Sequence, residues 1–260
     1  MKFLVPITSC FFLMACSHNL KKENAMPGEV MMTSGGNSEA VAFCQEGKID
    51  KGLENLKKTF KINRTNHNYW NSLAACYFYE GDFKKAEFHL NVAQEFNKSN
   101  EAYLLNNQGL ILYKLGHQTD GISILEQALK KQKNNRQIVL NLGQLYLHNG
   151  LYHKINDNFG TMIEKNGAFF KDQEIQAIVA IALVNLNKVD KAINIFKSLN
   201  EEKRVKAEVN LFYSLALSTK GKWEDASHLI GLVSGKLSPL NEMIYNSLKI
   251  KIESNLRPRG

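Results

Sequence analysis

The residues with the most recognition chemistry are asparagines set among aromatic side chains, between residues 71 and 148. The amides of Asn71, Asn106, Asn107 and Asn141 both donate and accept hydrogen bonds, so a row of them can satisfy the backbone of an extended peptide without reading its sequence. Aromatic rings beside such amides offer contact area at a small entropic cost. The side chains that accompany them are Phe78, Tyr79, Tyr103, Tyr113, Gln144 and His148.

No arrangement of residues predicts catalysis. The chain lacks a P-loop, a dinucleotide-binding fingerprint and an HExxH motif, and Gly231 to Gly235 places its serine one position too late for a nucleophile elbow. His148 and His153 stand on either side of Gly150, on different faces of a helix turn, and form no convincing metal-ligand pair. We therefore expect a protein that is not an enzyme, with no catalytic residue, metal or cofactor.

The N-terminus predicts export and lipid attachment. A positive start and the apolar run from Phe3 to Ala15 are too short to span a bilayer as a helix and have the form of a secretory signal, here residues 1–15. The run ends Leu-Met-Ala-Cys, which resembles a bacterial lipobox with Cys16 as the lipid attachment site. Cys10 is a second match with a poorer apolar core, and an ordinary signal peptide is the remaining alternative.

Residues 16–32 lack periodicity and are expected to form a flexible tether after the lipid. The residue after the cysteine is Ser17 and not an aspartate. By resemblance to enterobacterial lipoproteins, this implies export to the outer membrane, facing the periplasm. The membrane contact is then made through the lipid, whose buried methylenes supply the affinity.

The elements that would position the asparagines are helical hairpins, of which residues 70–93 form the clearest. Trp70, Leu73 and Tyr77 share one face of a first helix, and Ala86 and Leu90 share one face of a second. Gly81 and Asp82 between them supply a helix end and a helix start. Such a hairpin cannot bury its apolar face alone, so copies of it should stack.

The chain contains six such hairpins in register, and they resemble tetratricopeptide repeats. The units cover 33–66, 67–100, 102–135, 136–169, 173–206 and 207–240. Their turn position is Gly47, Gly81, Gly116, Gly150, Asn187 and Gly221, all residues that tolerate a left-handed backbone. The resemblance implies an all-α superhelical solenoid, which would be closed by a capping helix at 241–256 after the N-cap Ser238 and Pro239.

In the tetratricopeptide family, defined positions of each first helix line the concave surface, and the asparagine and aromatic residues above fall on them. The resemblance therefore implies a groove for a protein or an extended peptide, with a merely solvated polar face as the alternative. The same positions in the fifth and sixth units form an apolar patch that includes Ile178, Ile181, Leu211, Phe212 and Leu215. Either the C-terminal helix covers this patch, or it binds a partner or a second copy, or the register is wrong there.

Cys44 and Cys76 lie on adjacent first helices, and an exported protein permits a disulfide between them. Stacked helices have axes about 8–10 Å apart, whereas a disulfide needs Cα atoms within about 7 Å. We therefore expect two free thiols.

The formal net charge of +8 is scattered among acidic residues, which favours a solvated surface over contact with anionic lipid, and no nucleic-acid partner is expected. These features predict a membrane-anchored adaptor that helps an envelope complex assemble. The chain resembles small tetratricopeptide lipoproteins, including the pilotins of type IV pilus secretins and the related lipoproteins of tight-adherence pilus loci. Scaffolds for cell-wall enzymes and a purely structural membrane-surface protein are the alternatives.

Overall fold

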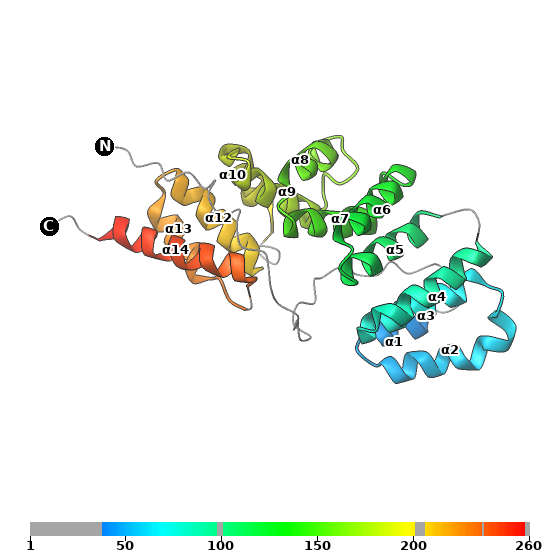
Figure 1. Ribbon diagram of the computed structural model, residues 1–260. Coiled ribbons are helices and arrows are strands. Elements are labelled where there is room, and N and C mark those ends of the chain that lie inside the picture. Colours follow the sequence, from blue (N-terminus) through cyan, green and yellow to red (C-terminus); the bar gives the residue numbers. More distant parts are fainter. Residues whose placement is uncertain (1–37, 98–100, 201–205, 236, 258–260) are drawn as a thin grey trace.

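The computed structural model describes residues 38–97, 101–200, 206–235 and 237–257, and every regular element in those ranges is helical. The helices pair as hairpins and stack into an elongated solenoid (Figure 1). The predicted all-α solenoid is confirmed. The first four units supply α1 (Ser38–Gln45), α2 (Ile49–Asn63), α3 (His67–Glu80), α4 (Phe83–Phe96), α5 (Ala102–Lys114), α6 (Gln118–Lys131), α7 (Arg136–His148), α8 (Tyr152–Phe159) and the 3-10 turn η1 (Thr161–Ile163). The remainder supplies α9 (Gln173–Asn185), α10 (Val189–Ser198), α12 (Ala207–Thr219), α13 (Trp223–Gly231) and α14 (Pro239–Leu256).

The six turns between paired helices have the same backbone conformation. Gly81 has a φ of 88°, and its N–H closes the end of α3 on the carbonyls of Tyr77 and Phe78. Asn187 has a φ of 57° and is the one residue other than glycine with a positive φ in the described ranges. The left-handed conformation predicted at all six turn positions is therefore confirmed. Glycine and asparagine are the residues that adopt it most readily.

Several helices begin where a short polar side chain caps them. The Asp82 carboxylate accepts from the backbone N–H of Lys85 at 3.1 Å, and the Ser238 hydroxyl accepts from that of Asn241 at 3.3 Å. Asn66, Asn135 and Asp172 cap α3, α7 and α9 in the same way. These caps satisfy N–H groups that have no partner inside the helix, so the sequence sets these helix starts locally.

Small residues bring paired helices into close contact. A Cβ added to Gly109 on α5 would lie 2.7 Å from the carbonyl oxygen of Gly121 on α6, and one added to Gly121 would lie 2.5 Å from that of Gly109. In the fourth unit the matching position holds the fully buried Ile155, and α8 ends early, at Phe159. The described chain then continues through η1 before α9 begins.

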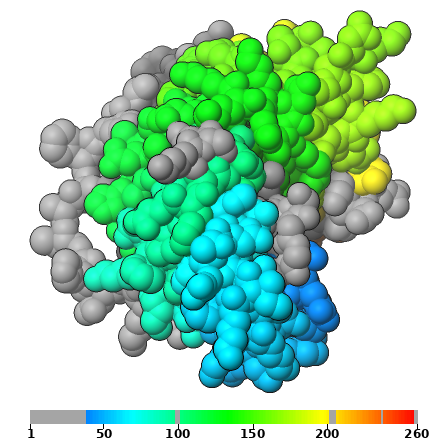
Figure 2. All heavy atoms as spheres, turned by 90° about the vertical axis from the view of Figure 1, so that its right-hand side faces the viewer, coloured from blue at the N-terminus to red at the C-terminus, as the bar shows by residue number. Residues whose placement is uncertain are grey.

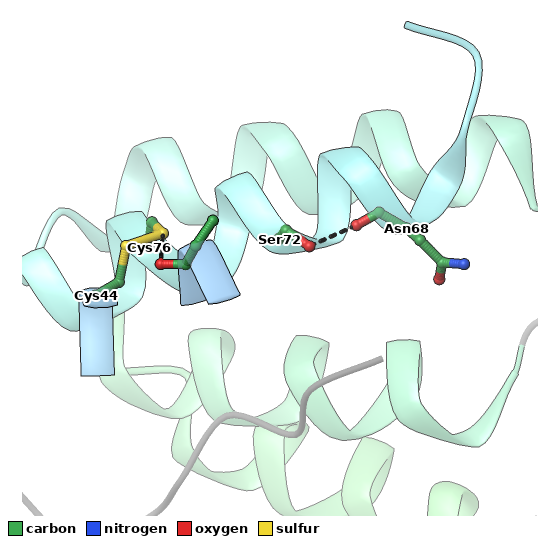
Figure 3. Close-up of a disulfide and its surroundings, with 5 residues drawn as sticks. Cys44, Asn68, Ser72 and Cys76 are labelled. Carbon is green, nitrogen blue, oxygen red and sulfur yellow. Dashed lines mark hydrogen bonds between the residues drawn. A yellow bond between two sulfur atoms is a disulfide. The ribbon is translucent and has the colours of Figure 1, made fainter. Parts of the chain in front are cut away.

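Cys44 and Cys76 form a disulfide between α1 and α3, so the prediction of free thiols is wrong (Figure 3). Their Cα atoms are 5.1 Å apart. The prediction compared the distance between helix axes with a limit that applies to Cα atoms. Each Cα lies about 2.3 Å from its axis, so Cα atoms on facing sides of two helices about 8–10 Å apart approach to about 3–5 Å.

The disulfide lies in a small hydrophobic core that is separate from the main one. This core is inside the end of the solenoid formed by the first helices, which faces the viewer in Figure 2. This core contains Ala40, Cys44, Leu56, Tyr69 and Cys76, while a single larger cluster extends from α1 to α14. Gly52 of α2 lies directly over the disulfide, where an added Cβ would overlap the sulfur of Cys44. The first hairpin therefore joins the second through a few buried side chains and one covalent bond.

Candidate functional site

The predicted asparagines come together as one hydrogen-bonded chain across three consecutive first helices. Asn107 on α5 donates to Asn71 on α3 at 2.7 Å, and Asn141 on α7 donates to Asn106 on α5 at 2.8 Å. Asn106 donates to Asn107 at 3.1 Å and joins the two pairs. Gln137, one turn before Asn141, extends the chain by donating to it at 3.1 Å. From Gln137 to Asn71, each amide N–H donates to the side-chain oxygen of the next amide in the series.

The four hydrogen-bonded asparagines are buried, and this burial makes their pairing matter for stability. Asn106 and Asn107 are 0% exposed, and Asn71 and Asn141 are 1% exposed. A buried amide is costly without partners, whereas a connected network inside the protein fixes one arrangement of its members. The amides are thus held in set orientations by each other. The sequence placed these residues in equivalent repeat positions, but it did not indicate that they pair with one another.

Two of the predicted aromatic residues, Tyr103 and Tyr113, form hydrogen bonds through their hydroxyl groups. The Tyr103 hydroxyl donates to Asn68 at 3.3 Å, and the Tyr113 hydroxyl accepts from Asn149 at 2.8 Å. The ring of Tyr113 meets the exposed His148 edge-on, with centroids 6.2 Å apart. Burial and the neighbouring Glu101 raise the pKa of Tyr103 to about 12, and burial raises the pKa of Tyr113. Both hydroxyls therefore stay protonated and act as neutral hydrogen-bonding groups at neutral pH.

The remaining predicted groove residues differ in accessibility. Phe78 is buried and packs edge-on against both Tyr79 and Phe83. Tyr79 and Gln144 are partly buried. Together with His148, these two give the predicted groove accessible as well as buried side chains. Their use in binding a partner stays a prediction.

Lys114 occupies a predicted groove position that was not among the residues predicted from the sequence. It is the last residue of α5, directly after Tyr113, and burial lowers the pKa of its amine. The register alone could have identified it, because it occupies one of the family's concave positions in the third unit.

The apolar patch of the fifth and sixth units is largely buried. Ile178, Ile181, Leu211 and Phe212 belong to the main core, and Leu215 is partly buried beside it. α14 packs against α12 and α13, as expected of a capping helix. Its N-cap Ser238 and first residue Pro239 are those predicted. Binding of a partner or of a second copy at this patch stays a prediction.

The predicted signal peptide, the lipid site Cys16 and the tether lie outside the described residues. Within the described ranges no helix has the length and apolar character needed to cross a bilayer. Those same ranges contain no cluster of histidine, cysteine and acidic side chains suited to a metal ion.

Comparison with known proteins gives a fold and one partial sequence match. No family model matches the chain. The chain is 26% identical over 125 residues to the BBSome complex member BBS4 of Bos taurus, a match that covers 48% of this chain and 24% of that protein. The chain thus spans about a quarter of the length of this curated relative.

Solved structures match over most of the chain. PilF of Pseudomonas aeruginosa has a TM-score of 0.65 at 16% identity, with 83% of this chain and 95% of that one covered. PilW, described as a widely conserved type IV pilus biogenesis factor, has a TM-score of 0.59 at 14% identity, with 80% and 96% covered. YrrB, described as a TPR protein with an unusual peptide-binding site, has a TM-score of 0.56 at 15% identity, with 76% and 97% covered. The fold of this chain is that of a tetratricopeptide-repeat solenoid.

Proposed function

We propose that this protein is a membrane-anchored adaptor of the bacterial envelope that holds an extended segment of a protein partner against the first helices of its second to fourth repeats. The observation that carries this proposal is the buried amide chain through Asn71, Asn107, Asn106 and Asn141. Because these amides are buried, they would not touch a partner; their pairing fixes α3, α5 and α7 relative to one another, so that the more accessible Tyr79, Gln144 and His148 are positioned before a partner arrives.

Two separate observations support the location in the bacterial envelope that we propose. The disulfide between Cys44 and Cys76 is typical of an oxidising compartment such as the periplasm. The lipobox-like sequence around Cys16 adds an anchor that places the solenoid beside a membrane. PilW is described as a type IV pilus biogenesis factor, so assembly of a pilus or of its secretin is the envelope process that we favour for this adaptor.

The groove is tested by site-specific crosslinking in intact cells. A photoreactive amino acid replaces His148, which is exposed beside Tyr113, in the full chain. The matched control carries it at His153, an exposed histidine of α8 in the same repeat. We expect one protein adduct from position 148 that is absent from position 153 and weakened by Gln144→Ala. Equal adducts at both positions, or none at 148, would contradict a partner in the groove.

The anchor is tested separately with Cys16→Ser. We expect this variant to lose incorporation of labelled palmitate and to move from the membrane fraction to the soluble fraction, because the acyl chains supply the membrane affinity. Continued membrane association of the variant would contradict the lipoprotein assignment. This result leaves the groove experiment unaffected, so the two parts of the proposal can fail independently.

A further inference from the structure

Exposed basic residues gather at one edge of the first three repeats. In each of these repeats the second helix ends where the first helix of the next repeat begins, so α2, α4 and α6 all end along the same edge of the solenoid. The exposed basic residues at or just after these helix ends are Lys61, Arg64, Lys130, Lys131 and Lys133. The two groups are far apart in the sequence, and the stacking of the hairpins brings them to one edge.

At the opposite edge, where each hairpin turns, two lysines are neutralised by neighbouring acidic residues. Lys48 pairs with Glu46 at 2.6 Å beside the first turn, and Lys85 pairs with Asp82 at 2.8 Å beside the second. In the described ranges, none of the five basic residues above has an ion-pair partner. Their charge is therefore available to a partner outside the chain.

The excess of positive charge is confined to the first three repeats. Glu95 and Glu101, on either side of the end of α4, are acidic residues of the same edge, and the five basic residues outnumber them. Beyond α6 the edge is ion-paired, because Arg136 contacts both Asp172 and Glu174 at the start of α9. The uncompensated charge therefore ends where the amide half of the solenoid ends.

Two large apolar side chains are exposed among these charges. Ile62, one residue before the end of α2, is 86% exposed, and Phe96, the last residue of α4, is 45% exposed. Basic residues near the end of a helix complement the helix dipole, but the dipole does not account for exposed hydrocarbon beside them. A bilayer surface accommodates both, because anionic headgroups attract the charges and the acyl boundary takes up the apolar side chains.

We propose that this edge docks on an anionic bilayer, with the basic residues at the headgroups and Ile62 and Phe96 at the boundary with the acyl chains. Nucleic acid would use the same charges, but it would leave the two apolar side chains in water. The described chain begins with α1, in the first of these repeats, so a lipid on Cys16 would bring this end of the solenoid toward the membrane. The docking itself needs no lipid, so it can fail separately from the adaptor function proposed above.

Vesicle flotation tests the contribution of charge. The full chain carries Cys10→Ser and Cys16→Ser, so that no lipid is attached to it. We expect it to bind vesicles of equal parts phosphatidylglycerol and phosphatidylcholine more strongly than vesicles of phosphatidylcholine alone, and salt should weaken this binding. Adding Lys130→Glu with Lys131→Glu should weaken binding to the mixed vesicles by about tenfold or more.

The matched control adds Lys191→Glu with Lys222→Glu to the same chain. Both lysines are exposed near hairpin turns of the fifth and sixth repeats, at the opposite edge, and their replacement changes the net charge by the same amount. Binding of this control to the mixed vesicles should stay within about threefold of the unaltered chain, because charges remote from the bilayer are screened. The apolar N-terminal run is the same in every variant, so differences between them report on the edge.

A fluorophore at position 62 tests the apolar contact. In the chain without Cys10 and Cys16, Ile62→Cys supplies the one thiol outside the disulfide, and Ile250→Cys on α14 is the control at another exposed isoleucine. Lipids with a spin label on the acyl chain quench a fluorophore that reaches the acyl boundary. We expect quenching at position 62 in the mixed vesicles and none at position 250.

The other outcomes overturn the proposal. Equal losses of binding in the two lysine variants would mean that only net charge matters. Binding without quenching at position 62 would mean that the apolar side chains stay in water. Binding to a short DNA duplex but not to the mixed vesicles would assign the edge to nucleic acid instead.

Discussion

Consecutive first helices meet through amides in one half of the solenoid and through hydrocarbon in the other. Between α3, α5 and α7 the contact positions hold the hydrogen-bonded Asn71, Asn106, Asn107 and Asn141. At the equivalent positions α9 and α12 carry Ile178, Leu211 and Phe212, all buried. Both halves are built from the same helical hairpins, so either kind of contact can join repeats. Amides do so with directional bonds that fix one alignment, whereas hydrocarbon does so through area and volume.

The boundary between the two halves is marked by an ionic contact. Arg136 at the start of α7 pairs with Asp172, the N-cap of α9, at 2.5 Å and with Glu174 at 2.6 Å. The nearby carboxylates raise the pKa of the Arg136 guanidinium, with the Asp172 hydrogen bond as the main cause. Because Arg136 is half exposed, this contact should orient the two helices more than it stabilises them.

The largest effect should come from removing volume in the hydrocarbon half. Phe212→Ala should lower the free energy of unfolding by about 3–5 kcal/mol, because it loses burial and leaves a cavity. Met243→Ala, at an exposed position of α14, is the control and should change it by less than about 0.5 kcal/mol. Urea unfolding followed by circular dichroism measures both. A loss below about 1 kcal/mol for Phe212→Ala would mean that the region repacks.

The disulfide should contribute slightly less than that. Replacing Cys44 and Cys76 together by alanine should lower the free energy of unfolding by about 3 kcal/mol, because the crosslink closes a loop of 32 residues in the unfolded chain. Hydrogen exchange should show the loss concentrated in α1 and α2, whose small core depends on this bond. Uniform loss of protection along the solenoid would contradict that assignment.

The next smaller loss of stability should come from truncating one asparagine in the amide half. Asn106→Ala leaves an oxygen of Asn107's amide and an N–H of Asn141's amide without this partner in a buried place, so we expect a loss of about 2 kcal/mol. A double-mutant cycle with Asn141→Ala should give a coupling of about 0.5–3 kcal/mol, as for residues in one network. Additive losses in the cycle would show that the two amides act independently, and the contrast between the halves would disappear.

The smallest effect concerns His89 of the second repeat. Its ring lies between Trp70 and Tyr77, with centroids 5.7 and 5.0 Å away, and its buried Nδ1 has no hydrogen-bond partner. Burial, with a lesser effect of Lys85, lowers the pKa of His89 from its ordinary value of 6.5. The unfolded chain therefore binds a proton more readily than the folded one, and stability should fall as the pH drops below about 6.5.

The test compares the wild type with His89→Phe, which keeps an aromatic ring between Trp70 and Tyr77 but cannot titrate. Urea unfolding at pH 7.5 and 5.5 should show a larger loss in the wild type than in the variant. Parallel losses in both proteins would mean that other groups carry the pH dependence.

The sequence by itself determined the features that depend on local backbone chemistry. Gly81 and Asn187 could be assigned to left-handed turns because few other residues adopt that conformation, and Ser238 and Pro239 set the start of α14 because they suit the first turn of a helix. The repeat register followed, since it rests on these same local signals in six copies. The fold was therefore predictable before any long-range contact was known.

Only the tertiary structure decided what depends on directions between helices. A register places Asn71 and Asn107 at similar positions, but whether their amides face a partner molecule or each other depends on rotation and spacing of the helices within an ångström. The distance between Cys44 and Cys76 depended in the same way on which sides of α1 and α3 face each other.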